Sequence, residues 1–307
     1  MNSFSIHSLR IALIAITVLL AIFGVLFPTW LSSWDFSLFI LLVVLTGIPH
    51  GATDHLIFFH LRKNTGKYLF AKFIIVYLLV MLVYGLCWLL FPLASLLFFL
   101  WMSAYHFGQS QFTNLKLPEN HLFKKVIYVL WGSWLLFSIL LLNAEETILV
   151  LQGLFTQAEF YLSFVLPYRT EIIALLSWAT VVVLLWGLQK KWMNKATFIR
   201  ELLTVFVLLL LFVHTSLWIS FGVYFGLWHA LSSIYFEVKG LNNISFLGFF
   251  KKALPFSLIS FVGIGILLGI GIWWNEKDSL VLLFFMALST LTLPHTLYMQ
   301  RFYASFN

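Results

Sequence analysis

Charged residues are scarce in this sequence, and their scarcity decides the class of protein. Only 9% of the 307 residues are Asp, Glu, Lys or Arg, whereas hydrophobic residues make up 62%. A soluble domain carries roughly 25% charged residues, which cover its surface against water. With so few, the chain must use lipid as part of its solvent. The composition therefore excludes a disordered chain, a coiled coil and a nucleic-acid-binding domain.

Cysteine is almost absent as well. The one cysteine, Cys87, lies in an apolar run. A single thiol forms neither a disulfide framework nor a thiolate metal cluster, so any metal site must use other ligands. The first apolar stretch has no small-residue cleavage site and is followed by similar stretches. We therefore expect it to be a mature helix and not a signal peptide.

Long apolar runs fill most of the chain. Because a helix needs roughly 20 apolar residues to cross a bilayer, and because these runs do not alternate as strands do, the sequence predicts an all-α, polytopic transmembrane helix bundle. We expect residues 1–307 to form a single integral-membrane domain. The expected spans number about ten, at residues 9–27, 36–60, 68–91, 93–112, 122–142, 171–189, 197–213, 216–238, 253–274 and 279–300.

Two places in this assignment depend on local signals. The break between the third and fourth spans depends on Phe91-Pro92 alone, since proline fits the first turn of a helix but interrupts its interior. The segment 146–166 is apolar, but several residues interrupt it. We expect an interfacial or re-entrant helix there instead of a further span, because of Gln152, Gly153, Gln157 and Glu159.

The basic residues follow the predicted spans closely. If the N-terminus is cytoplasmic, every Lys and Arg except Arg169 and Lys277 falls on the inner side, where positive charge concentrates in membrane proteins. We therefore expect both termini in the cytoplasm and a multi-pass protein of the cell inner (cytoplasmic) membrane. The net charge of +7 then follows from topology and implies contact with the lipid bilayer, with no nucleic-acid partner.

Histidine is the polar residue that stands out. Four of the nine histidines lie near span ends or in loops, where an interfacial imidazole is ordinary: His7, His60, His121 and His214. The other five lie inside predicted spans, where polar groups are costly and usually functional. They are His50, His55, His106, His229 and His295.

Four of these five share a depth. Each lies somewhat past the middle of an even-numbered span, and these spans all run in the same direction, so at 1.5 Å per residue the imidazoles reach a similar level. Four helices that each bring one imidazole to one level can build a metal site in a bundle core. The sequence therefore predicts a metal bound by His50, His106, His229 and His295, with separate structural roles as the alternative. Imidazole ligands suit iron, copper, zinc or nickel.

Two neighbours of His50 are expected to support this site. Asp54 is the one carboxylate well inside a predicted span, and it follows His50 by four residues, on the same helix face. We expect it to accept a hydrogen bond from an imidazole N–H and so fix the orientation of that ring. His55 lies about 140° around the helix from His50, so we expect it to be a hydrogen-bonding neighbour and not a ligand.

Four short motifs resemble those of one family. The run GIPHGATDH at residues 47–55 resembles the first motif of the Brp/Blh membrane proteins, the bacterial and archaeal β-carotene 15,15′-dioxygenases. SAYHFG at 103–108 resembles their second motif, YFGLWH at 224–229 the third, and LPH at 293–295 a proline-histidine near the family's C-terminus. From residue 47 in the first motif to the last predicted span, the motifs are spread over most of the chain.

The resemblance implies an enzyme with a specific reaction. It implies a membrane-embedded, non-haem Fe(II) enzyme, a β-carotene 15,15′-dioxygenase, that splits β-carotene at its central double bond with O₂ into two molecules of retinal. The retinal would be handed to a microbial rhodopsin. Aromatic side chains near the ligands would then line the slot for the polyene: Tyr105, Phe107, Tyr224 and Trp228.

One position departs from the family pattern. Many members carry a further histidine four residues after the third motif, where this chain has Ser233. Either His295 completes a set of four histidines or a ligand is missing. The alternatives to the dioxygenase are a membrane transporter, a haem b protein with two axial histidines, and a non-catalytic membrane protein of carotenoid or retinal metabolism.

Overall fold

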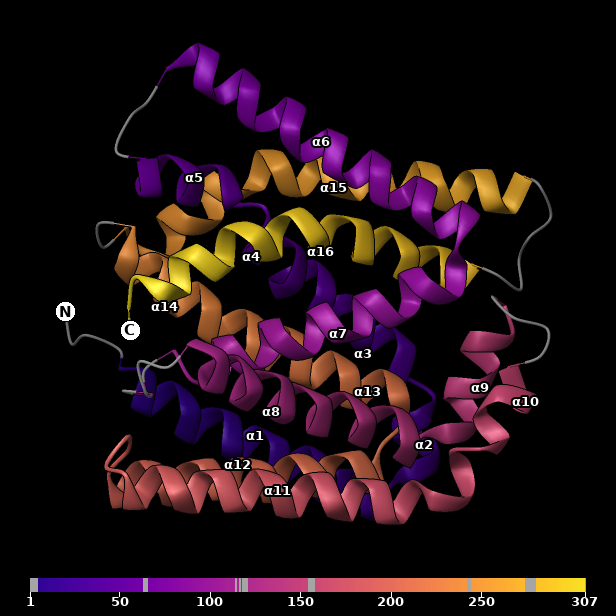
Figure 1. Cartoon of the computed structure of the whole chain (residues 1–307). Helices are drawn as coiled ribbons and strands as arrows, with labels where there is room; N and C mark the ends of the chain where they lie inside the picture. Colours follow the sequence, from indigo (N-terminus) through magenta and orange to yellow (C-terminus); the bar gives the residue numbers. More distant parts are fainter. Residues whose placement is uncertain are drawn as a thin grey trace.

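The computed structural model describes residues 5–62, 66–113, 115, 117, 121–153, 158–241, 244–273 and 280–306. These residues form helices and short turns, and no strand occurs among them (Figure 1). The all-α prediction is therefore confirmed. Lys277 and Gln157 lie outside the described residues, as do the side chains of His121 and Glu159.

Nine helical segments of the described chain are long and apolar enough to cross a membrane. Seven are essentially continuous helices and two are composite. The continuous ones are α1 (Ile6–Leu26), α6 (Lys67–Leu90), α8 (His121–Leu142), α11 (Arg169–Gln189), α12 (Lys195–His214), α15 (Phe246–Trp273) and α16 (Leu280–Ala304). A short 3₁₀ turn, η2 (Leu166–Tyr168), leads into α11. By the length and composition of its helices the chain is thus a multi-pass membrane protein, as predicted.

The fourth predicted span is α7 (Pro92–Gln111). It is a 20-residue helix that runs back from the end of α6 towards the start of α8 (Figure 1). Pro92 occupies its first turn, and Phe91 caps α6, so the chain breaks where Phe91-Pro92 predicts. Polar residues in its C-terminal half make it less hydrophobic than those nine segments, and it is not among them. The described residues thus contain nine segments that could span a membrane, where the sequence predicts about ten.

Two spans are broken by π-helical turns. The second consists of α3 (Asp35–Leu42), η1 (Val43–Gly47), α4 (Ile48–Gly51) and α5 (Asp54–Arg62); the eighth consists of α13 (Leu217–Gly222), η3 (Val223–Leu231) and α14 (Ser232–Gly240). The π-helical turns η1 and η3 pack against each other, so closely that a Cβ on Gly47 would lie 2.4 Å from the Phe225 ring. Such π-helical turns are rare in proteins, and where they occur they frequently lie at functional sites.

The segment predicted to be interfacial forms two short helices, not one. They are α9 (Ala144–Gln152) and α10 (Ala158–Ser163), and neither is long enough to span a bilayer. A third short helix, α2 (Pro28–Ser32), follows α1. Glu146 on α9 accepts a hydrogen bond from the backbone N–H of Leu217 at 2.7 Å. Burial raises the pKa of the Glu146 carboxyl, and this N–H partly offsets the rise. The short helix thus holds the start of the eighth span.

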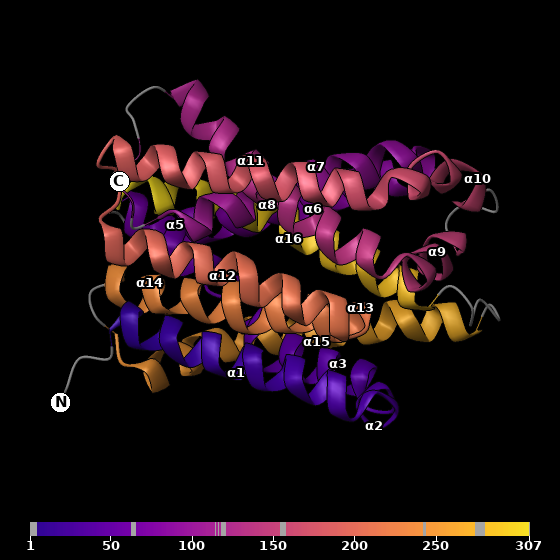
Figure 2. The ribbon, with the colours of Figure 1, turned by 90° about the horizontal axis from the view of Figure 1, so that it is seen from below.

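The helices are arranged in layers. Helices α1, α11 and α12 form one side of the bundle, nearest the viewer in Figure 2, whereas α6 and α15 lie on the opposite side (Figure 1). Between them lie α7, α8 and α16. Helices α7 and α8 touch through backbone, because a Cβ on Gly108 would lie 2.0 Å from the carbonyl oxygen of Tyr128 and one on Gly132 would lie 1.9 Å from that of Ala104. This contact fixes the height of α7, which carries His106.

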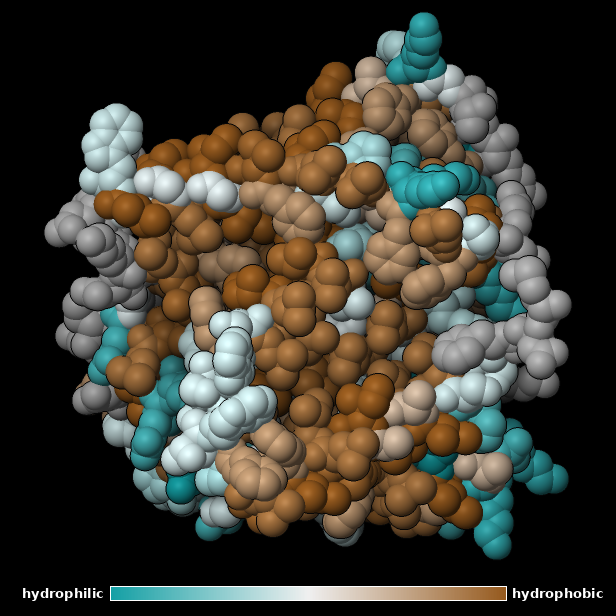
Figure 3. Space-filling model, turned by 180° about the vertical axis from the view of Figure 1, so that it is seen from behind, coloured by the Kyte–Doolittle hydropathy of each residue, from teal (hydrophilic) through white to brown (hydrophobic). Residues whose placement is uncertain are grey.

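The surface and the interior differ in the way expected of a protein in lipid. Hydrophobic residues cover most of the face seen in Figure 3, and hydrophilic residues gather towards its ends. A buried polar network ties α1, α7 and α12 together: Arg10 pairs with Glu201 at 2.5 Å and donates to the carbonyl oxygen of Gln111 at 3.0 Å. Both charges are buried, so each depends on the other for compensation.

Candidate metal centre

Four imidazoles meet in the middle of the bundle. They come from four different segments: His50 from α4, His106 from α7, His229 from η3 and His295 from α16. One ring nitrogen of each lies within 4.8 Å of the others, and all four side chains are buried. The structure therefore brings together the four histidines that the sequence places at one depth.

A carboxylate holds the ring of His50. Glu237, on α14, accepts a hydrogen bond from His50 Nδ1–H at 2.5 Å. Its other carboxylate oxygen accepts one from the Thr53 hydroxyl. Glu237 has no solvent-exposed surface. This contact fixes the tautomer of His50, with the hydrogen on Nδ1 and the lone pair on Nε2.

A second carboxylate holds the ring of His295. Asp54 accepts a hydrogen bond from His295 Nδ1–H at 2.8 Å and another from the Tyr77 hydroxyl, also at 2.8 Å. Asp54 thus orients an imidazole, but one from the far end of the chain instead of its neighbour His50. The reason is local: the chain turns at Ala52 and Thr53, between α4 and α5, so residues four apart do not share a helix face there.

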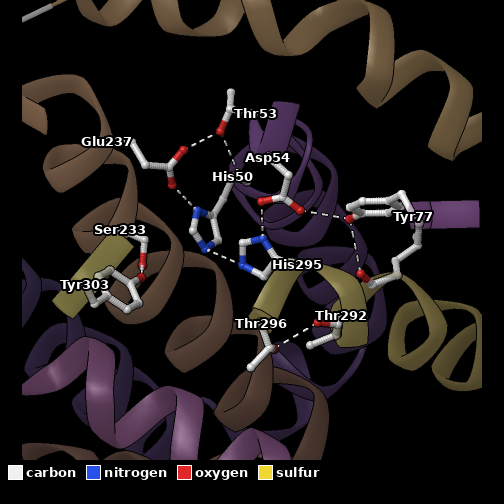
Figure 4. A network of polar contacts seen from close by, with 11 residues as sticks. His50, Thr53, Asp54, Tyr77, Ser233, Glu237, Thr292, His295, Thr296 and Tyr303 are labelled. Carbon is white, nitrogen blue, oxygen red and sulfur yellow. Dashed lines mark hydrogen bonds and ion pairs between the residues drawn. The ribbon is translucent and has the colours of Figure 1, made fainter. Parts of the chain in front are cut away.

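The two supported imidazoles face each other. Figure 4 shows a continuous chain of polar contacts that runs from Thr53 and Glu237 through His50 and His295 to Asp54 and Tyr77. Because both Nδ1–H groups are donated to carboxylates, both Nε2 atoms present lone pairs, and these atoms lie 3.1 Å apart. Two lone pairs at this distance repel each other unless a proton or a cation lies between them.

The other two imidazoles have orphaned ring nitrogens. Both nitrogens of His106 and the Nδ1 of His229 are buried without a hydrogen-bond partner in the described structure. Buried polar atoms are nearly always paired, and an exception calls for a physical explanation. A metal ion bound by the four rings would satisfy the lone pairs, so the residues present fit a metal bound by imidazole nitrogen.

Glu237 is the residue that sequence reasoning missed. The sequence places only Asp54 well inside a span, but Glu237 and Glu201, near the ends of their spans, are buried as well. Glu237 lies in the last turn of the predicted span 216–238, where a charge ordinarily reaches the interface. One feature of the sequence could have indicated its role: Glu237 is the one carboxylate in its predicted span, which also carries a candidate ligand, His229.

A hydrophobic cavity of about 620 Å³ opens beside the histidines. It lies between α4, α5, α6, α15 and α16, and its polar end is formed by the four imidazoles and Asp54. Elsewhere its walls are mostly aromatic and aliphatic side chains, such as Phe73, Met81, Phe107, Phe225, Phe256 and Leu267. This volume is in the range of small-molecule sites, about 300–1,000 Å³.

Of the four residues expected to line the substrate slot, the structure places one at the cavity. Phe107 lines the cavity, whereas Tyr105, Tyr224 and Trp228 do not. Tyr224 and Trp228 are buried in the core beside α1 and α8, and the Trp228 indole donates to Thr17 at 2.9 Å. Phe225, next to them in sequence, lines the cavity instead, and its ring stacks 6.0 Å from that of His229.

His55 and Ser233 lie away from the four-ring contact. The His55 ring lines the cavity and packs against Phe256, with ring centroids 4.5 Å apart; no hydrogen bond from it to another histidine is found in the described chain. The Ser233 hydroxyl is buried with two others, 2.6 Å from Tyr303 and 3.3 Å from Ser110. The family's histidine position is thus occupied here by a small hydroxyl cluster.

Comparisons with known proteins agree with these features. The family model described as beta-carotene 15,15'-dioxygenase matches residues 41–303, which include all four imidazoles. A beta-carotene 15,15'-dioxygenase of the uncultured marine bacterium 66A03 is 37% identical over 83 residues, which are 25% of this chain and 30% of that protein. No solved structure matches the chain. Since the family model covers most of the sequence and the motifs at the four histidines resemble the family's, the chain belongs to the beta-carotene 15,15'-dioxygenase family.

Proposed function

We propose that this protein cleaves β-carotene at its central double bond with O₂ and releases two molecules of retinal. The observation that carries the proposal is the meeting of four buried imidazoles at the end of a hydrophobic cavity. The family to which the chain belongs supports the identity of the substrate. The ligands proposed for the metal are His50, His106, His229 and His295, and the metal proposed is Fe(II).

The charges around the rings favour a divalent ion. Asp54 and Glu237 each accept two hydrogen bonds, as ionised carboxylates do. Four neutral imidazoles, two carboxylates and a divalent cation together carry no net charge, which suits a buried site in lipid. When bound, Fe(II) would supply the activation of O₂.

The protein's own residues have three tasks in this reaction. Glu237 and Asp54 hold the rings of His50 and His295 with their Nε2 lone pairs turned inward. The hydrophobic walls of the cavity, among them Phe107 and Phe225, exclude water and hold a stiff hydrocarbon in line with the rings. Holding two reactants in a fixed geometry accounts for much of the rate in such a reaction.

The reaction needs no proton transfer from the protein. One carbon–carbon double bond breaks, each of its carbons gains one atom of O₂ as a carbonyl oxygen, and the number of hydrogens is unchanged. The carboxylate in the cavity wall, Asp54, is already occupied by His295 and Tyr77. Its role is therefore to orient an imidazole and not to act as a general acid or base.

Purified protein in detergent micelles tests the proposal directly. With β-carotene and air we expect retinal as the product and about one iron per chain, as one ion bound by all four imidazoles requires. His106→Ala should lose both the iron and the product, whereas His7→Ala should keep both, because His7 is distant from the cluster and contacts Arg200. An iron-loaded protein that forms no retinal from β-carotene would overturn the proposed activity.

The cellular setting is part of the same proposal. We place the protein in the cell inner (cytoplasmic) membrane as one domain over residues 1–307, with both termini in the cytoplasm, because nearly all Lys and Arg then face inward. The first residues of α1 and the last of α16 lie at the same end of the bundle, which supports this topology (Figure 1). Retinal released into that membrane would be available to a microbial rhodopsin.

A further inference from the structure

The cavity beside the histidines reaches the outer surface of the bundle. Two of its lining residues, Leu78 on α6 and Ile259 on α15, are 57% and 66% exposed. A side chain that lines a cavity and is also exposed on the outside lies at the mouth of that cavity. The mouth therefore lies between α6 and α15.

This mouth opens on the side of the bundle and not at its ends. Helices α6 and α15 both pack on α16, which lies beneath them (Figure 1). Leu78 and Ile259 lie near the middle of their helices, and both helices are long and apolar enough to span a membrane. In a bilayer such a mouth faces the lipid hydrocarbon.

A glycine keeps the α15 edge of the mouth open. Gly263 lines the cavity one turn after Ile259, and a Cβ at this position would meet no atom within 4 Å. The same continuous cavity contains the rings of His50 and His295 at its inner end. An apolar path thus leads from the lipid-facing surface to the imidazole cluster.

We propose that the carotenoid substrate enters sideways from the lipid through this portal, defined by Leu78, Ile259 and Gly263, and that the retinal leaves by the same path. The inference rests on the proposed function for the identity of the ligand. The physical reason is that a polyene hydrocarbon dissolves in the bilayer core and would lose all the free energy of apolar burial on passing through water. The portal lets the substrate reach the metal site without leaving an apolar medium.

Bulky substitutions at the portal test this path. Leu78→Trp, Ile259→Trp and Gly263→Phe should each narrow the mouth and lower kcat/KM for β-carotene at least about tenfold. They should leave the iron content unchanged, because no histidine is altered. Gly263→Ala adds only a methyl group to this open space. We therefore expect its kcat/KM to lie between those of the unmodified protein and Gly263→Phe.

The same helices offer matched controls that do not line the cavity. Leu79 and Ile266 are 56% and 59% exposed, and Gly265 also has open space beside it. Leu79→Trp, Ile266→Trp and Gly265→Phe add the same bulk to the same lipid-facing helices. We expect these variants to stay within about twofold of the unmodified protein.

A binding measurement separates the portal from the activity. Under anaerobic conditions the rate at which the protein takes up β-carotene from vesicles can be followed by visible absorbance, with no turnover. Slow uptake in the portal variants and normal uptake in the controls supports the portal even if no retinal forms in air, a result that would sink only the proposed activity. Equal uptake and equal kcat/KM in portal and control variants would refute the portal while leaving the activity in place.

Discussion

Replacing Glu237 by glutamine is the sharpest test of how the imidazole cluster is held. The amide has nearly the shape of the carboxylate, so His50 Nδ1–H still finds an oxygen acceptor, but the negative charge is lost. The amide NH₂ group would then face the Thr53 hydroxyl, which donates to the carboxylate in the native chain. The substitution therefore removes charge from behind one ring while leaving the packing of α14 nearly unchanged.

The expected loss can be estimated from the contact. A carboxylate behind a metal-bound imidazole contributes about 10–100-fold to metal affinity, which equals about 1.4–2.8 kcal/mol. Because the contact between Glu237 and His50 is fully buried, we expect Glu237→Gln to fall in the upper half of this range. Thr53→Ala removes one hydrogen bond to the same carboxylate, and we expect it to weaken the free energy of metal binding by about 1 kcal/mol.

An anaerobic titration of metal-free protein with Fe(II) against a competing chelator measures the affinity. Co(II) absorption in the same protein reports whether four nitrogen ligands still bind. We expect Glu237→Gln to keep the spectrum of the bound ion but to release it more easily, and the metal-free variant should melt as the metal-free native chain does. An unchanged affinity, with His50 still a ligand, would refute the idea that Glu237 supports the site.

Three further outcomes follow from the same geometry. Asp54→Asn should lower iron affinity about 10–100-fold, as Glu237→Gln does, while keeping the Co(II) spectrum of four nitrogen ligands; loss of one ligand from that spectrum would make Asp54 itself a ligand. His295→Ala should abolish iron retention and retinal formation, whereas Ser233→His should improve neither, because that position is packed against other hydroxyls; a gain in iron affinity from Ser233→His would point to a vacant ligand position. Glu146→Gln should raise the melting temperature at about pH 7 but not at about pH 4: burial raises the pKa of Glu146, so this group favours folding when protonated and opposes it once ionised. A larger gain in melting temperature at about pH 4 than at about pH 7 would show that the ionised Glu146 carboxylate does not oppose folding.

The sequence could locate the imidazoles because polar groups inside long apolar runs are rare. His50, His106, His229 and His295 interrupt runs whose lengths and directions follow from hydrophobicity and charge alone. Depth along a helix is a simple count of residues, and the count places these four rings at one level. Their meeting in the structure needs nothing more than the packing of four helices.

The sequence could not show which neighbours face the site, because the two broken spans do not follow a regular helix. The π-helical turns at η1 and η3 each widen the helix by an extra residue, which turns the following side chains by about 100°. In the eighth span the sequence predicts Tyr224 and Trp228 as lining residues, whereas the structure turns Phe225 to the cavity. Nothing in the hydrophobic pattern of either span marks where such a turn occurs.

The position of α16 in the bundle has a consequence for how the protein is made. This helix is the last described element in chain order, yet it lies at the centre, in contact with α5, α6, α7 and α15. A chain is synthesised from its N-terminus at about 5–20 residues per second, so about nine-tenths of the 307 residues are made before the first residue of α16, Leu280. Until α16 inserts, one wall of the cavity is missing, and Asp54 has no imidazole to orient. A metal held by all four imidazoles can therefore bind only after this helix has inserted, and a chain that stops before it leaves Asp54 with the Tyr77 hydroxyl but without His295.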